Sequence, residues 1–177
     1  MIRACRRGVL AGALAVPTVA GLAHWRWRHG EASVLLHDPA LTAGLRFAEA
    51  GAARGGEVVA IEGDRIRLAR TVLERKPALI AGVSRHADAL MIEEVAREAG
   101  YVPVAALHGR GRTCTDECQP GWTALGRLAQ AAEGNWIEAL ADYAVRPGAL
   151  AGATVASAFP PRADPGLVVG WVLAPRA

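Results

Sequence analysis

The sequence predicts an α/β protein built on a doubly wound parallel sheet of about five strands. Continuous apolar runs alternate with amphipathic segments of helical period along most of the chain, and Gly, Pro or Asp separates them. Alternating strands and helices favour a parallel sheet with helices on both faces and right-handed crossovers. The length of 177 residues suits a single domain with a real core.

The first predicted strand covers residues 32–37, a continuous apolar run of the kind that parallel strands buried on both faces show. Asp38 and Pro39 follow it and predict a helix start, with a capping carboxylate and a proline at the first helical position. This helix is expected to reach about Arg54, and Gly55-Gly56 ends it.

The second strand is predicted at residues 57–61, and Asp64 is a candidate cap for the helix after it. Residues 78–83 predict a third strand. Ser84 is then the candidate cap of a helix that runs through Ala99.

The fourth strand is predicted at residues 101–107, where Pro103 suits a sheet edge or a strand start. A helix over residues 123–145 and a final strand over residues 167–173 follow, separated by an irregular connection at residues 146–166. Five strands in this arrangement suit a flavodoxin-like or Rossmann-like sheet, within one domain that covers residues 31–177.

Residues 1–30 form a separate leader. A basic start is followed by an apolar run over residues 9–23, which has the length of a signal peptide core. Arg6-Arg7 followed by Gly, Val and Leu resembles the twin-arginine export signal of bacteria, although Cys5 stands where that signal often has Ser or Thr. The resemblance implies an exported, periplasmic protein.

The residues after the apolar run leave the fate of the leader open. Small residues at Gly21 and Ala23 suit cleavage. In contrast, Trp25 and Trp27 alternate with arginines, as in the interfacial belt of a membrane anchor, so a retained leader would contact the membrane through residues 9–28.

The net charge is located in the leader. Arg3, Arg6 and Arg7 are its only charged residues up to residue 23 and account for the formal charge of +3. Because residues 24–177 hold 17 basic and 17 acidic residues, the pI near 9.1 gives no support to nucleic-acid binding.

A ligand site is expected where the parallel strands end, because open α/β sheets bind ligands beyond the carboxyl ends of their strands. Polar side chains follow each of the first four predicted strands. The candidate binding residues are His37, Asp38, Glu62, Asp64, Ser84, Arg85, His86, His108 and Arg110.

Three functional interpretations are compatible with this set: a metal site, an anion site and a hydrolase site. His37, His86 and His108 are the histidines outside the leader and could ligate a metal. Arg85 and Arg110, near a helix start, could hold a carboxylate or phosphate. Asp38, Asp64 and Ser84 also have a purely structural role as helix caps, which is favoured for each of them alone.

A hydrolase is the third interpretation. Gly82-Val-Ser84 resembles the start of the nucleophile elbow of α/β-hydrolases, which implies Ser84 as the nucleophile, His108 as its base and Asp116 as the orienting acid. His86 replaces the final glycine of that motif, and the order of the three residues departs from the family pattern.

Cys114 and Cys118 are the two cysteines beyond the leader. An even number of cysteines in an oxidising compartment favours a disulfide between them. Two thiolates are too few for structural zinc, and the C-x3-C spacing is not that of a thioredoxin-type site; a redox-active or copper-handling pair is the minor alternative.

The sequence therefore favours a non-catalytic protein that is exported or membrane-tethered. It is expected to bind a small anionic ligand at the strand ends, or to serve as an accessory subunit of a periplasmic or inner-membrane complex. A small enzyme, using either Ser84 or the three histidines, is the alternative, and no cofactor is identified.

Overall fold

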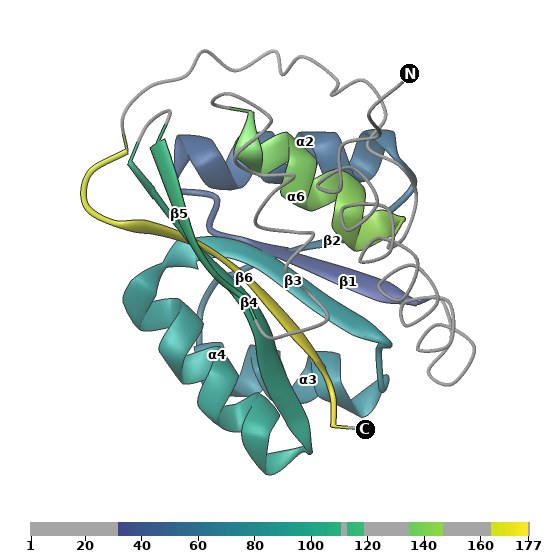
Figure 1. Cartoon of the computed structure of the whole chain (residues 1–177). Helices are drawn as coiled ribbons and strands as arrows, with labels where there is room; N and C mark the ends of the chain where they lie inside the picture. Colours follow the sequence, from purple (N-terminus) through teal and green to yellow (C-terminus); the bar gives the residue numbers. More distant parts are fainter. Residues whose placement is uncertain (1–31, 111–112, 119–134, 147–163, 177) are drawn as a thin grey trace, which may run out of the picture.

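The computed structural model describes residues 32–110, 113–118, 135–146 and 164–176. They form an α/β domain in which helices cover both faces of a six-stranded mixed sheet (Figure 1). The strands are β1 (Ser33–His37), β2 (Glu57–Ala60), β3 (Leu79–Arg85), β4 (Tyr101–Arg110), β5 (Thr113–Cys118) and β6 (Val168–Pro175). The described helices are α2 (Thr42–Ala53), α3 (Arg65–Glu74), α4 (His86–Glu98) and α6 (Trp136–Val145).

The first half of the sheet confirms the predicted alternation of strands and helices. β1 pairs in parallel with β2 on one side and with β3 on the other. Residues of α2 contribute to the core on one face of the sheet, and residues of α3 and α4 to the core on the other. The chain therefore changes face between the two crossovers, as in a doubly wound fold.

The second half of the sheet departs from the prediction of five parallel strands. The order is β2-β1-β3-β6-β4-β5, and β6 lies between β3 and β4 and is antiparallel to both. β5 forms an additional antiparallel pair with β4. The sequence prediction was wrong here because an apolar run shows that a strand is buried on both faces but not which way it runs.

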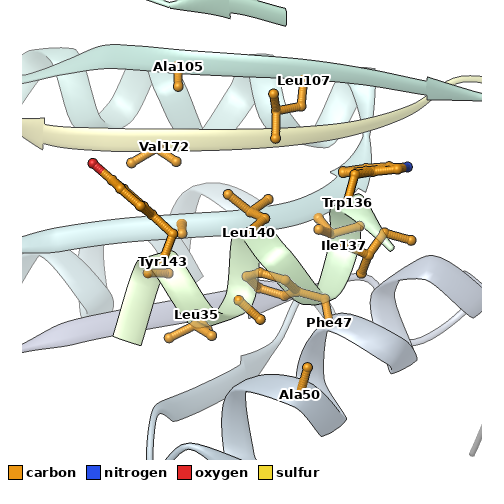
Figure 2. Packing of buried hydrophobic residues seen from close by; sticks show 14 of the residues in the cluster. Leu35, Phe47, Ala50, Ala105, Leu107, Trp136, Ile137, Leu140, Tyr143 and Val172 are labelled. Atoms are coloured by element: carbon orange, nitrogen blue, oxygen red, sulfur yellow. The ribbon is translucent and has the colours of Figure 1, made fainter. Parts of the chain in front are cut away.

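Two apolar layers, one on each face of the sheet, form the core. On the side of α2 and α6, Phe47 of α2 and Leu140 of α6 are fully buried near Leu35 and Leu107 of the sheet (Figure 2). On the other side, Ile92 of α4 is buried in the layer that α3 and α4 share with the sheet. Both helix layers thus stabilise the sheet by removing apolar surface from water.

Trp171 of β6 requires a glycine on the neighbouring strand. A Cβ atom built on Gly82 of β3 would lie 2.2 Å from the Trp171 ring, which is closer than atoms can approach. The indole therefore occupies the space that a side chain on Gly82 would need, on the face that α4 covers.

Pro103 lies near the start of β4. Its partner in β6 is Leu173, the register shifts directly after it, and β5 pairs with β4 only from Ala105 onward. This position agrees with the predicted preference for a strand start.

One of the three predicted helix caps is confirmed by the structure. Asp64 accepts hydrogen bonds from the N–H groups of Ile66 and Arg67 and caps α3, as expected. Asp38 does not cap α2, which begins at Thr42 with Leu41 as its N-cap, and Ser84 does not cap α4, whose N-cap is Arg85. Among the described residues, no helix is long and apolar enough to cross a membrane.

Candidate functional site

The polar residues that follow β1 and β3 lie side by side. Asp38 follows β1, and its N–H donates a 3.0 Å hydrogen bond to the carbonyl oxygen of Val83 in β3. Because β1 leads into α2 on one face while β3 leads into α4 on the other, this is the switch point at which doubly wound sheets bind ligands.

Asp38 and Arg85 form an ion pair across this switch point. Asp38 Oδ2 lies 3.0 Å from Arg85 Nη1, and the two side chains are 3% and 47% exposed. The other carboxylate oxygen, Oδ1, accepts a 2.9 Å hydrogen bond from the N–H of Ala40. A buried carboxylate thus holds the guanidinium of a side chain that is about half exposed.

Asp38 Oδ2 has no well-directed hydrogen bond. It is inaccessible to water, and although Arg85 Nη1 is close, their contact does not meet hydrogen-bond geometry. Buried polar atoms in folded proteins are nearly always hydrogen-bonded, so an exception calls for a physical explanation. The pairing of Asp38 is therefore electrostatic, and one of its oxygens retains acceptor capacity.

The start of α4 adds donors next to Arg85. Its N-cap, Arg85, makes no side-chain capping hydrogen bond. The first N–H groups of an α-helix have no partner within the helix and carry a partial positive charge. They add N–H donors beside Arg85, and the one carboxylate in this first turn, Asp88, is paired with Arg65.

His86 and His108 meet on the α4 side of this edge. Their ring centroids are 6.3 Å apart with an interplanar angle of 48°. His86 is exposed and His108 is half-buried. Two of the three histidines that the sequence singled out thus come together, from the start of α4 and the end of β4.

His37 is the third histidine and is half-buried at the end of β1. Burial lowers its pKa, while the nearby carboxylates of Asp38 and Glu62 act in the opposite direction. Its Nδ1 atom is buried and has no hydrogen-bond partner. Among the described residues, no group of three or more His, Cys, Asp and Glu side chains is arranged to hold a metal ion, which gives no support to the alternative interpretation of the three histidines as metal ligands.

The surroundings of Ser84 are not those of a catalytic nucleophile. It is fully buried, its Oγ accepts a 3.0 Å hydrogen bond from Trp171 Nε1, and it donates one of 3.0 Å to the carbonyl oxygen of Arg85. A hydroxyl that is buried and bonded on both sides is closed to a substrate. The geometry therefore gives no support to the hydrolase interpretation, and the side chain of Asp116 lies outside the described parts.

The remaining predicted site residues are exposed, have a structural role, or have side chains outside the described parts of the structure. Glu62 is exposed after β2, and Asp64 is used as the cap of α3. Arg110 ends β4, but its side chain lies outside the described parts of the structure, as do residues 1–31 with the predicted leader.

Cys114 and Cys118 lie four residues apart in β5. An extended strand rises about 3.3 Å per residue, which places their Cα atoms roughly 13 Å apart. A disulfide needs Cα atoms within about 7 Å. The predicted bridge therefore requires β5 to leave the extended conformation, and it stays a prediction.

Asp164 is a residue that the sequence did not single out. Its Oδ1 and Oδ2 accept hydrogen bonds of 2.6 and 2.8 Å from the N–H groups of Thr42 and Ala43, the first residues of α2. The local signal at Asp164-Pro165-Gly166 indicates a turn but not this partner 122 residues away. The start of α2 is thus already occupied by a carboxylate of the protein, while the start of α4 is not capped by a side chain.

Comparisons with family models, with curated proteins and with solved structures found no match.

Proposed function

We propose that this protein binds a small molecule with an acid group, a carboxylate or a phosphate, at the switch point between β1 and β3. The observation that carries the proposal is the Asp38–Arg85 pair, in which a buried carboxylate positions a half-exposed guanidinium at the carboxyl edge of the sheet. Arginine presents several N–H donors in a planar fork, which suits carboxylates and phosphates.

The surroundings of Arg85 support the same ligand chemistry. The N–H groups at the start of α4 follow directly in the chain, and exposed His86 is the first residue of that helix. Helix starts are favourable positions for anions. The start of α2 is less suited because Asp164 already occupies it.

We further propose that the protein acts outside the cytoplasm and without catalysis, as a ligand-binding or accessory protein of the periplasm or inner membrane. The twin-arginine resemblance of the leader supports this location. Fractionation of cells that produce the full chain tests it: the protein is expected outside the cytoplasm, and replacement of Arg6 and Arg7 by lysine should retain it inside. Equal export of the double-lysine variant would contradict the twin-arginine route.

Calorimetric titration of the full chain with succinate and with inorganic phosphate tests the binding proposal. At least one of them is expected to bind at neutral pH and low salt, and Arg85→Ala should weaken that binding by about tenfold or more, because a charged hydrogen-bonding partner is lost. Arg70→Ala, which removes an exposed arginine of α3, serves as the control for the change in net charge. Equal affinity of the wild type and Arg85→Ala would overturn the proposal.

A further inference from the structure

The charges at the switch point restrict the ligand further. We infer that it is a zwitterion of the α-amino acid class, whose acid group binds Arg85 and whose ammonium group binds Asp38. This inference rests on the proposed function, because it concerns the same site and names the kind of molecule that fits it.

The first argument is the state of the Asp38 carboxylate. Its side chain is 3% exposed, Oδ1 is bonded to the N–H of Ala40, and Oδ2 is close to a cation without a directed hydrogen bond. When Arg85 turns toward the acid group of the ligand, an ammonium group, with three N–H donors on one charged atom, can take its place at Oδ2. It then supplies the counter-charge that Arg85 gave and the directed hydrogen bond that this oxygen lacks.

The second argument is charge balance. A ligand that offers only an anion competes with Asp38 for Arg85. If it draws the guanidinium away, the buried carboxylate is left without a partner, which weakens the binding of such a ligand. A zwitterion brings its own cation to Asp38, so both charges exchange partners and neither is left unpaired.

The third argument is position. Asp38 and Arg85 extend from neighbouring strand ends that the hydrogen bond from the Asp38 N–H to the Val83 carbonyl holds together. Their charged atoms are 3.0 Å apart, and the acid and amino groups of an α-amino acid are separated by a single carbon. The half-exposed Arg85 side chain can move outward on its flexible stem, while both backbones stay fixed in the sheet and at the start of α4.

A calorimetric comparison of three ligand types on the full chain tests this inference. The twenty common amino acids are titrated first, and the tightest binder is compared with the same molecule without its amino group and without its acid group. Removal of the amino group is expected to weaken binding to the wild type by about tenfold or more, as loss of a charge-assisted hydrogen bond does. Asp38→Asn should weaken binding of the amino acid and strengthen binding of the deaminated acid, because that acid then no longer competes with the Asp38 carboxylate for Arg85.

The outcomes separate this inference from the proposed function. If the deaminated acid binds as tightly as the amino acid, and this binding depends on Arg85, the ligand is a simple acid and the inference is wrong while the proposed function stands. If no amino acid and no simple acid binds, both are wrong. The comparison of ligands on the wild-type protein decides between these results even where Asp38→Asn fails to fold.

Discussion

Arg46 and Glu138 form a buried ion pair with two hydrogen bonds that joins α2 to α6. Arg46 Nε lies 2.7 Å from Glu138 Oε1, and Nη2 lies 2.8 Å from Oε2. The two residues are 7% and 3% exposed. The guanidinium and the carboxylate are each other's counter-charge. Because both are buried, water cannot take the place of either group when it is removed.

Replacement of one member of this pair should destabilise the fold strongly. Glu138→Gln leaves the Arg46 guanidinium buried without a counter-charge, and we expect a loss of about 3–5 kcal/mol in the free energy of unfolding, measured by urea denaturation. The double variant Arg46→Met with Glu138→Leu should recover most of the loss, since a buried pair can be replaced by apolar side chains. Glu57→Gln, in the exposed pair with Arg75, is the control. A loss no larger than that of the control would contradict the account.

Asp164 should stabilise the start of α2. Asp164→Ala removes the acceptors of the Thr42 and Ala43 N–H groups, and loss of such a cap typically costs about 0.5–2 kcal/mol. Amide hydrogen exchange is expected to accelerate at Thr42 and Ala43, together with a lower melting temperature. Glu74→Ala, which removes an exposed carboxylate from the far end of α3 and does not touch these two N–H groups, is the comparison. Unchanged exchange at both amides in Asp164→Ala would show that the contact does not hold in solution.

His37 should make stability depend on pH. Because burial lowers its pKa in the folded state below the ordinary value of about 6.5, the unfolded chain binds the proton more readily. Stability from this group is therefore present above about pH 6.5 and is lost as the pH falls toward the folded pKa. Urea denaturation across this range should show the decrease, and His37→Gln should reduce its slope. An NMR titration that gives His37 a pKa above 6.5 would contradict the sign.

The redox state of Cys114 and Cys118 tests both the compartment of the protein and the conformation of β5. A bridge between Cys114 and Cys118 and an extended β5 exclude each other. If the exported protein forms the disulfide that the sequence predicts, its intact mass rises by about two hydrogens on reduction, and β5 is then not extended. An unchanged mass, with two thiols open to alkylation after unfolding, would contradict the disulfide and leave β5 extended alongside β4.

The elements from β1 to α4 could be predicted because their own residues specify them. The apolar run that ends at His37 and the capping Asp64 are local signals, and both strand and helix follow within a few residues of the expected bounds. β5 was missed because Thr113–Cys118 is a polar strand at the edge of the sheet, with no apolar run to mark it. The direction of β6 depends on its neighbours, which no local pattern encodes.

The sequence predicted which residues belong to the candidate site, but not how their side chains are arranged in space. The rule that ligands bind at strand ends correctly placed Asp38 and Arg85 at one edge. Successive side chains of β3 point to opposite faces of the sheet. Ser84 therefore points inward against Trp171, where it cannot contact a ligand. Asp164 was missed because its partners lie more than a hundred residues away.

The central claim is that the ligand binds between the ends of β1 and β3. Backbone amide NMR during titration of the isotope-labelled full chain with the tightest-binding acid or amino acid tests this most directly. The account predicts saturable shifts at Asp38 and at residues 85–88, and their loss in Arg85→Ala but not in Arg70→Ala. Saturable shifts centred elsewhere, with residues 38 and 85–88 unaffected, would contradict it.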